Sequence, residues 1–119
     1  MATAVKRKLS GSTDGMAILI AATASPGTAI HTAVSGITAG TFDEIWLWAF
    51  NSKSVPVVLT IQFGSSRAPD HNIALTVAPN SGLVPAVPGL ILQNADTVAA
   101  FADTTNVVTV GGFVNSITD

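Results

Sequence analysis

The chain has 119 residues, enough for one domain with a single hydrophobic core but not for two. Charged residues make up only 10 % of it and hydrophobic residues 48 %, a composition that excludes intrinsic disorder. The net charge of −2 argues against a general nucleic-acid-binding protein, and the lack of cysteine excludes disulfides, thiolate metal sites and cysteine nucleophiles.

The first fifteen residues are polar and basic. Lys6, Arg7 and Lys8 are three of the five basic residues in the chain. With the apolar run 16–22 they imitate a secretory signal, but the polar stretch between the basic and apolar parts is untypical of one. We therefore predict a flexible N-terminal arm over residues 1–15. It is either a solubilising tail or a segment that reaches an acidic surface of a neighbouring subunit.

The rest of the chain consists of short runs rich in Val, Ile, Thr and aromatic residues, with Gly, Pro, Asn and Asp between them. No run has the apolar periodicity of a helix. Even spacing of short strands is typical of an antiparallel sandwich or barrel, here a single domain over residues 16–119. Eight strands are predicted, over residues 16–22, 28–34, 43–50, 55–63, 71–77, 89–93, 96–102 and 106–114.

Two of the predicted strands alternate apolar and polar residues, which is typical of a sheet with one face on the core. The proline-containing stretch 83–88 instead predicts an edge or a crossing loop, because proline cannot donate to a strand ladder. The predicted core side chains are Val57, Leu59, Ile61, Phe63, Ile73, Leu75 and Val77.

The segment 43–50 is apolar on both faces. One face carries Ile45, Leu47 and Ala49, and the other carries two tryptophans and a phenylalanine. Such a strand is either central and covered on both sides, or its outer face is covered by another subunit, because an exposed aromatic patch promotes aggregation. Two tryptophans on one face can also form a platform for sugars. The three aromatic side chains on this second face of the segment are Trp46, Trp48 and Phe50.

Catalytic and metal-binding patterns are weak in this chain. His31 lies in a predicted strand and His71 in a loop beside Asp70, and a zinc site would need the fold to bring all three together. Asp43 and Glu44 are adjacent on a strand and face opposite sides, so they cannot act as a carboxylate pair. We predict no enzymatic activity, no cofactor and no metal site.

Several turn and strand motifs of this chain together resemble those of a known class of proteins. They are the segments 8–15 (KLSGSTDG), 26–33 (PGTAIHTA), 43–48 (DEIWLW), 79–82 (PNSG), 88–94 (PGLILQN) and 106–115 (NVVTVGGFVN). Over residues 8–115 the chain resembles small virion proteins of tailed bacteriophages, and most of all the capsid cement (decoration) proteins.

This resemblance implies a non-enzymatic structural protein with a small β-sandwich fold, often a jelly roll. It implies a homodimer or homotrimer on the capsid surface, made in the cytoplasm of the host bacterium, that binds the major capsid protein and neither nucleic acid nor a membrane. The candidate contact residues are Trp46, Trp48, Phe50, Lys6, Arg7 and Lys8. The alternative is a tail, neck or fibre component that recognises a host-surface glycan through Trp46 and Trp48.

Overall fold

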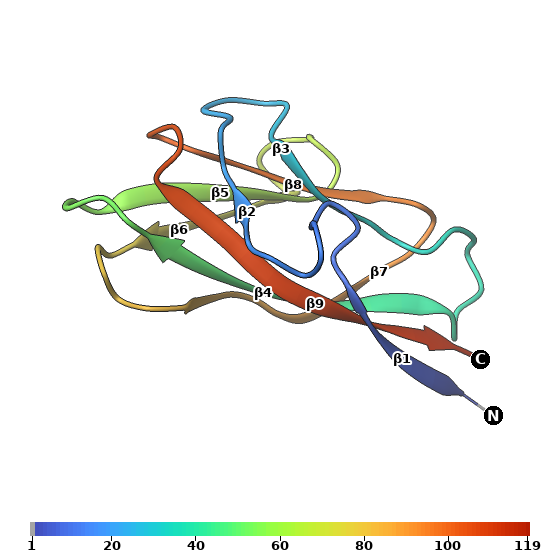
Figure 1. Cartoon of the computed structure of the whole chain (residues 1–119). Coiled ribbons are helices and arrows are strands. Elements are labelled where there is room, and N and C mark those ends of the chain that lie inside the picture. Colours follow the sequence, from blue (N-terminus) through green and yellow to red (C-terminus); the bar gives the residue numbers. More distant parts are fainter. Residues whose placement is uncertain (1) are drawn as a thin grey trace.

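The computed structural model describes residues 2–119, and its regular elements there are all β-strands (Figure 1). Within this part of the chain there is no helix that could cross a membrane. The strands are β1 (Thr3–Lys8), β2 (Ile18–Leu19), β3 (Thr28–Thr32), β4 (Phe42–Asn51), β5 (Val57–Gly64), β6 (Asn72–Val77), β7 (Val84–Leu92), β8 (Thr97–Ala102) and β9 (Val108–Thr118).

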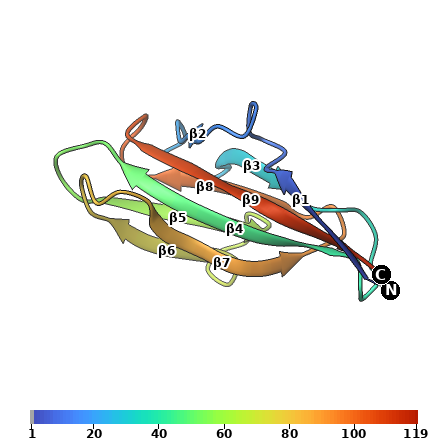
Figure 2. The ribbon, with the colours of Figure 1, turned by 60° about the horizontal axis from the view of Figure 1, so that its bottom comes forward.

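The strands form two antiparallel sheets that pack face to face (Figure 2). The five-stranded sheet has the order β1–β9–β4–β7, and β2 pairs with the other half of β9. The four-stranded sheet has the order β3–β8–β5–β6. From β2 onward the chain crosses between the sheets at every connection except the β5–β6 hairpin. This is the strand order of a jelly roll, so the predicted all-β antiparallel sandwich is confirmed.

The core between the sheets is aliphatic. Of the predicted core residues, Val57, Leu59, Ile61 and Val77 are fully buried. Phe63, Ile73 and Leu75 are only half-buried, because β6 is an edge strand and Phe63 lies near the end of β5. The buried cluster consists of Leu9, Ile20, Ile30, Ile45, Leu47, Ala49, Val57, Leu59, Ile61, Val77, Val87, Val98, Ala100, Ala102, Val108, Val110 and Val114.

The predicted arm over residues 1–15 requires correction. Met1 lies outside the described residues, but Thr3–Lys8 form β1, which pairs with β9 from Thr3 opposite Thr118 to Lys8 opposite Phe113. Leu9 is fully buried in the core. The reason is that β9 extends to residue 118, four residues beyond the predicted end, and so offers a ladder to residues 3–8. The sandwich therefore does not begin at residue 16.

The other predicted strands are found with shifted ends. The predicted strand 16–22 shrinks to β2, and the predicted strand 89–93 extends back to Val84. Its extension includes Pro85 and Pro88, and β7 lies at the edge of its sheet with two register shifts against β4. The prediction of an edge over 83–88 is thus confirmed, since an edge strand tolerates residues without an N–H donor.

Candidate functional site

The aromatic side chains of this protein lie outside its fully buried core, although Phe63 packs against that core. All seven, five phenylalanines and two tryptophans, are only partly buried. The strand alternation places five of them on the outer face of the five-stranded sheet, four from β4 and one from β9. We call this surface the aromatic face; its members are Phe42, Trp46, Trp48, Phe50 and Phe113.

The position of β4 explains this face. β4 is a central strand, between β9 and β7, and it turns Ile45, Leu47 and Ala49 into the core. Trp46 and Trp48 must then point outward, because successive side chains of a strand face opposite sides. No third layer of residues 2–119 covers them, so the structure excludes the alternative in which the chain itself covers both faces of this strand.

Three rings form one cluster at the centre of the aromatic face. The ring centroids of Trp46 and Trp48 are 6.3 Å apart, those of Trp46 and Phe113 6.3 Å, and those of Trp48 and Phe113 5.9 Å. The interplanar angles are 17°, 18° and 27°. The centroids make a nearly equilateral triangle, whereas in a face-to-face column the outer two would be about twice as far apart. The rings thus form a compact patch.

Two glycines make room for Trp46. A Cβ atom at Gly89 of β7 would lie 2.7 Å from the Cζ2 atom of the Trp46 ring, and Gly89 also has a φ of +78°. A Cβ atom at Gly112 of β9 would lie 1.9 Å from the carbonyl oxygen of Trp46. The neighbouring strands on both sides of Trp46 therefore require glycine at these positions.

Charged groups flank the ring cluster on two sides. The Nε1 atom of Trp46 donates a hydrogen bond of 2.7 Å to Oε1 of Glu44, and Nδ2 of Asn115 donates one of 3.1 Å to the same oxygen. These bonds, that from Trp46 above all, lower the pKa of the Glu44 carboxyl. The Nζ atom of Lys6 lies 4.3 Å from the ring centroid of Phe113, within the range of a cation–π interaction.

The six residues predicted as contacts separate into two groups. Trp46, Trp48 and Phe50 lie on the aromatic face, and Lys6 lies beside it over Phe113. Arg7 and Lys8 instead line a cleft of about 470 Å³, whose wall also includes His31 and Asp43. Sequence reasoning missed Phe113, because its contact with Trp46 depends on the pairing of β4 with β9.

His31 and Asp43 form a buried polar link beneath this cleft. Nε2 of His31 lies 2.7 Å from Oδ2 of Asp43, and the backbone N–H of Ser10 donates to Nδ1 of His31 at 3.0 Å. Since Nδ1 accepts, the proton of the neutral ring is on Nε2, which donates to Asp43. Asp43 also accepts from the Val34 N–H at 3.2 Å and from the Ser116 hydroxyl at 2.7 Å.

These hydrogen bonds have a structural role and do not prepare a nucleophile. Both ring nitrogens of His31 are occupied, one by a backbone N–H and the other by Asp43, so neither is available to activate a serine hydroxyl. His71 lies apart, in the β5–β6 connection, where it hydrogen-bonds to the hydroxyl of Ser65. His31, His71 and Asp70 are not brought together, and residues 2–119 contain no cluster of three metal-ligating side chains.

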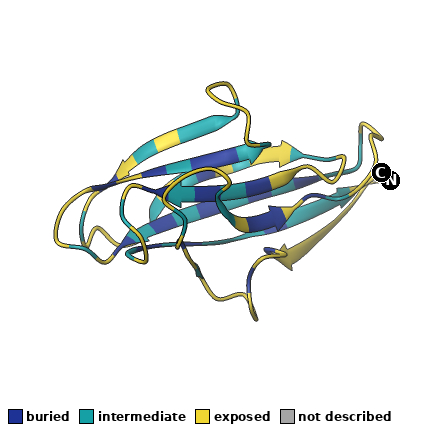
Figure 3. Cartoon of the chain, turned by 90° about the horizontal axis from the view of Figure 1, so that it is seen from above, coloured by how far each residue is buried: buried dark blue, intermediate teal, exposed yellow. Residues whose placement is uncertain are grey.

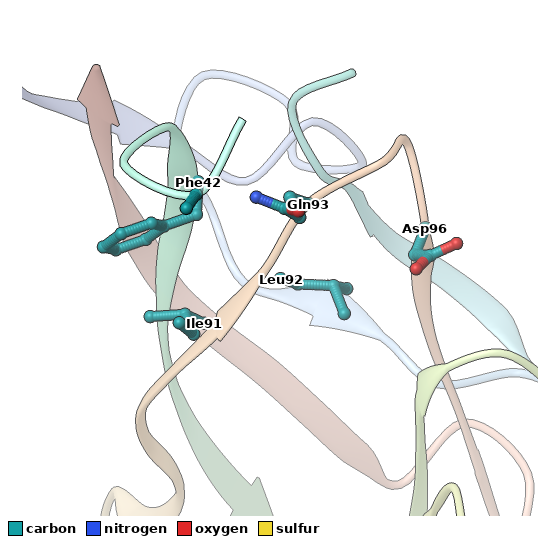
Figure 4. A pocket seen from close by; sticks show the side chains of 6 residues that line it. Phe42, Ile91, Leu92, Gln93 and Asp96 are labelled. Carbon is teal, nitrogen blue, oxygen red and sulfur yellow. The ribbon is translucent and has the colours of Figure 1, made fainter. Parts of the chain in front are cut away.

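A second hollow, of about 370 Å³, lies at one end of the aromatic face (Figure 4). Phe42 and Ile91 form part of its lining, and Asp96 is its one charged lining residue. Gln93 also lines the hollow, and its Nε2 atom donates to the carbonyls of Thr38 and Thr41 at 3.0 and 2.9 Å. The hollow extends the apolar surface and contains no convergent set of polar groups.

Comparisons with protein-family models, with curated proteins and with solved structures gave no match. The fold and the site define a jelly-roll sandwich with an aliphatic core, a buried His–Asp link and an aromatic outer face.

The His31–Asp43 link should be important for stability. We expect His31→Ala to lower the free energy of unfolding by about 2–4 kcal/mol, because it removes one donor from a buried carboxylate and the acceptor of the Ser10 N–H. His71→Ala, at a half-buried loop position, is the control and should cost less than about 1 kcal/mol. Urea unfolding followed by circular dichroism measures both. Equal losses would contradict this role for His31.

Protonation of the Glu44 carboxyl should disturb its hydrogen bond with Trp46. Because its folded-state pKa is lowered, the ionised carboxylate contributes stability above the ordinary value of 4.5, and this is lost as pH falls through the folded-state pKa. We expect the Trp46 indole N–H resonance to shift below pH 4.5 in the natural protein. Glu44→Gln keeps an acceptor oxygen and removes the titration, so its resonance should not shift there. The same shift in both proteins would refute the assignment.

Proposed function

We propose that this protein is a non-enzymatic structural protein of a bacteriophage virion, a capsid cement protein that binds major capsid subunits from outside and stabilises the head. The sequence resemblance to small virion proteins suggests this class, and a jelly-roll sandwich suits it. The observation that carries the proposal is the aromatic face, where Trp46, Trp48 and Phe113 form one half-exposed ring cluster.

Physical reasons support a contact role for this face. Aromatic side chains supply the largest apolar area per residue, and they are enriched where proteins meet other proteins. Here none of them is fully buried, and five of the seven lie on one broad side of a molecule that measures 48 × 27 × 21 Å. That side is large enough for an interface of standard size, about 800 Å² per partner. A capsid subunit that covers it would remove the ring cluster from water.

The proposed function involves several copies of this protein that associate with one another. We propose a homodimer or homotrimer on the capsid surface, in which the aromatic face contacts the major capsid protein or a neighbouring copy. The low charge content of 10 % agrees with a protein that has much of its surface covered in the particle.

Co-sedimentation with heads that lack this protein tests the proposal. The natural protein should bind expanded heads stoichiometrically and form a dimer or trimer by light scattering. Trp48→Ala should weaken head binding by about 30-fold or more, because a central interfacial tryptophan contributes at least about 2 kcal/mol. Phe101→Ala, at a half-buried aromatic on the outer side of the four-stranded sheet, is the matched control. Absence of head binding, or equal losses in both variants, would refute the proposal.

One observation favours a second candidate function, recognition of a host-surface glycan by a tail, neck or fibre component. The Trp46 and Trp48 rings are within 17° of parallel, and the Glu44 carboxylate beside them is an acceptor for sugar hydroxyls. Binding on a glycan array that Trp46→Ala or Trp48→Ala abolishes would support this candidate. An array without any bound glycan would count against it.

A further inference from the structure

The outer edge of β1 is an unpaired strand edge that carries a cluster of positive charges. β1 pairs with β9 on one side only, over six residues without a register shift, and all six residues are exposed (Figure 3). It contains no proline. The backbone N–H and C=O groups along its other side therefore form a free ladder onto which another extended chain can add.

The outer edges of β3, β6 and β7 are less suited to the addition of a selected partner strand. β7 contains Pro85 and Pro88 and shifts register twice. β3 is covered by the chain before β2, since the Gly11 N–H donates to the Ile30 carbonyl and the Thr32 N–H donates to the Ser10 hydroxyl. β6 (Asn72–Val77) is open but carries no charged residue that could select a partner.

The charges on β1 determine which chain can add. Lys6, Arg7 and Lys8 lie on consecutive positions, and within residues 2–119 none of them forms an ion pair with a carboxylate. Lysines on an edge strand discourage pairing with a like-charged strand. A second copy of β1 would bring six cations and no carboxylate into one two-stranded ribbon. An acidic strand would instead place opposite charges about 5 Å apart across the ladder.

We infer that the free edge of β1 binds an extended acidic segment of a partner protein, which adds to the five-stranded sheet as a further strand. Acidic side chains at alternate positions of that segment face Lys6 and Lys8, and a neighbouring one faces Arg7 at the rim of the cleft. Lys6 also contacts Phe113, so the added strand adjoins the aromatic face. Assigning the segment to the major capsid protein rests on the proposed function; binding of an acidic strand to β1 does not.

A peptide tests the edge directly. The probe is a capped eight-residue peptide of valine and glutamate with three consecutive glutamates at its centre, and its control replaces each glutamate with lysine. We expect saturable binding of the glutamate peptide, with slower amide hydrogen exchange in β1, and weaker binding in 1 M salt than in 0.1 M salt. The lysine peptide should not bind.

The variant Arg7→Glu/Lys8→Glu should weaken peptide binding at least tenfold. It leaves Lys6 and its contact with Phe113 in place. The matched control is Lys53→Glu/Arg67→Glu, which reverses the other two basic residues and gives the same change in net charge, yet should bind the peptide like the natural protein. No protection of β1, equal binding of both peptides, or undiminished binding by the β1 variant would each overturn the inference.

Head binding separates this inference from the proposed function. If both are right, Arg7→Glu/Lys8→Glu lowers head affinity at least tenfold and Lys53→Glu/Arg67→Glu does not. If the β1 variant binds heads normally while Trp48→Ala does not, the capsid assignment of the segment is wrong and the cement function stands. If the natural protein does not bind heads, the proposed function fails, and the peptide result alone decides whether β1 is an acidic-strand site.

Discussion

A two-layer fold can bury only one face of any strand, and β4 is apolar on both. This constraint organises the molecule. The aliphatic face of β4 packs between the sheets, so its aromatic face must be outside. The neighbouring strands accommodate that outer face with Gly89 and Gly112, which lie against Trp46 from either side. Stability and surface chemistry are thus divided between the two faces of a single strand.

The start of β4 is held by the buried carboxylate of Asp43. It accepts hydrogen bonds from His31 of the four-stranded sheet, from the backbone of Val34 and from Ser116 of β9. A desolvated carboxylate requires such donors, so the two sheets and the segment around Ser10 are held in one arrangement. Through β9 this link also helps to fix the register that sets Phe113 opposite Trp46.

Much of the fold could be predicted from the sequence, because alternation and turn residues are local signals. Strand β1 was missed because all its residues are exposed, so its sequence has no alternation of apolar and polar residues that would mark a strand. The Trp46–Phe113 and His31–Asp43 contacts were missed because they depend on how the strands pair and how the sheets pack. Residue type identified Trp46 and Trp48 as candidates, but only the register between β4 and β9 shows the three-ring cluster.

The aliphatic core has a consequence for chemical damage. The chain has no cysteine or tyrosine, and of its two methionines Met16 is 60 % exposed, while Met1 lies outside the described residues. Both tryptophans are on the aromatic face. Among residues 2–119, the thioether and indole groups that oxidants attack therefore lie outside the core. An oxidant would modify the outer surface of the protein first, so the aromatic face could be chemically altered while the sandwich stays folded.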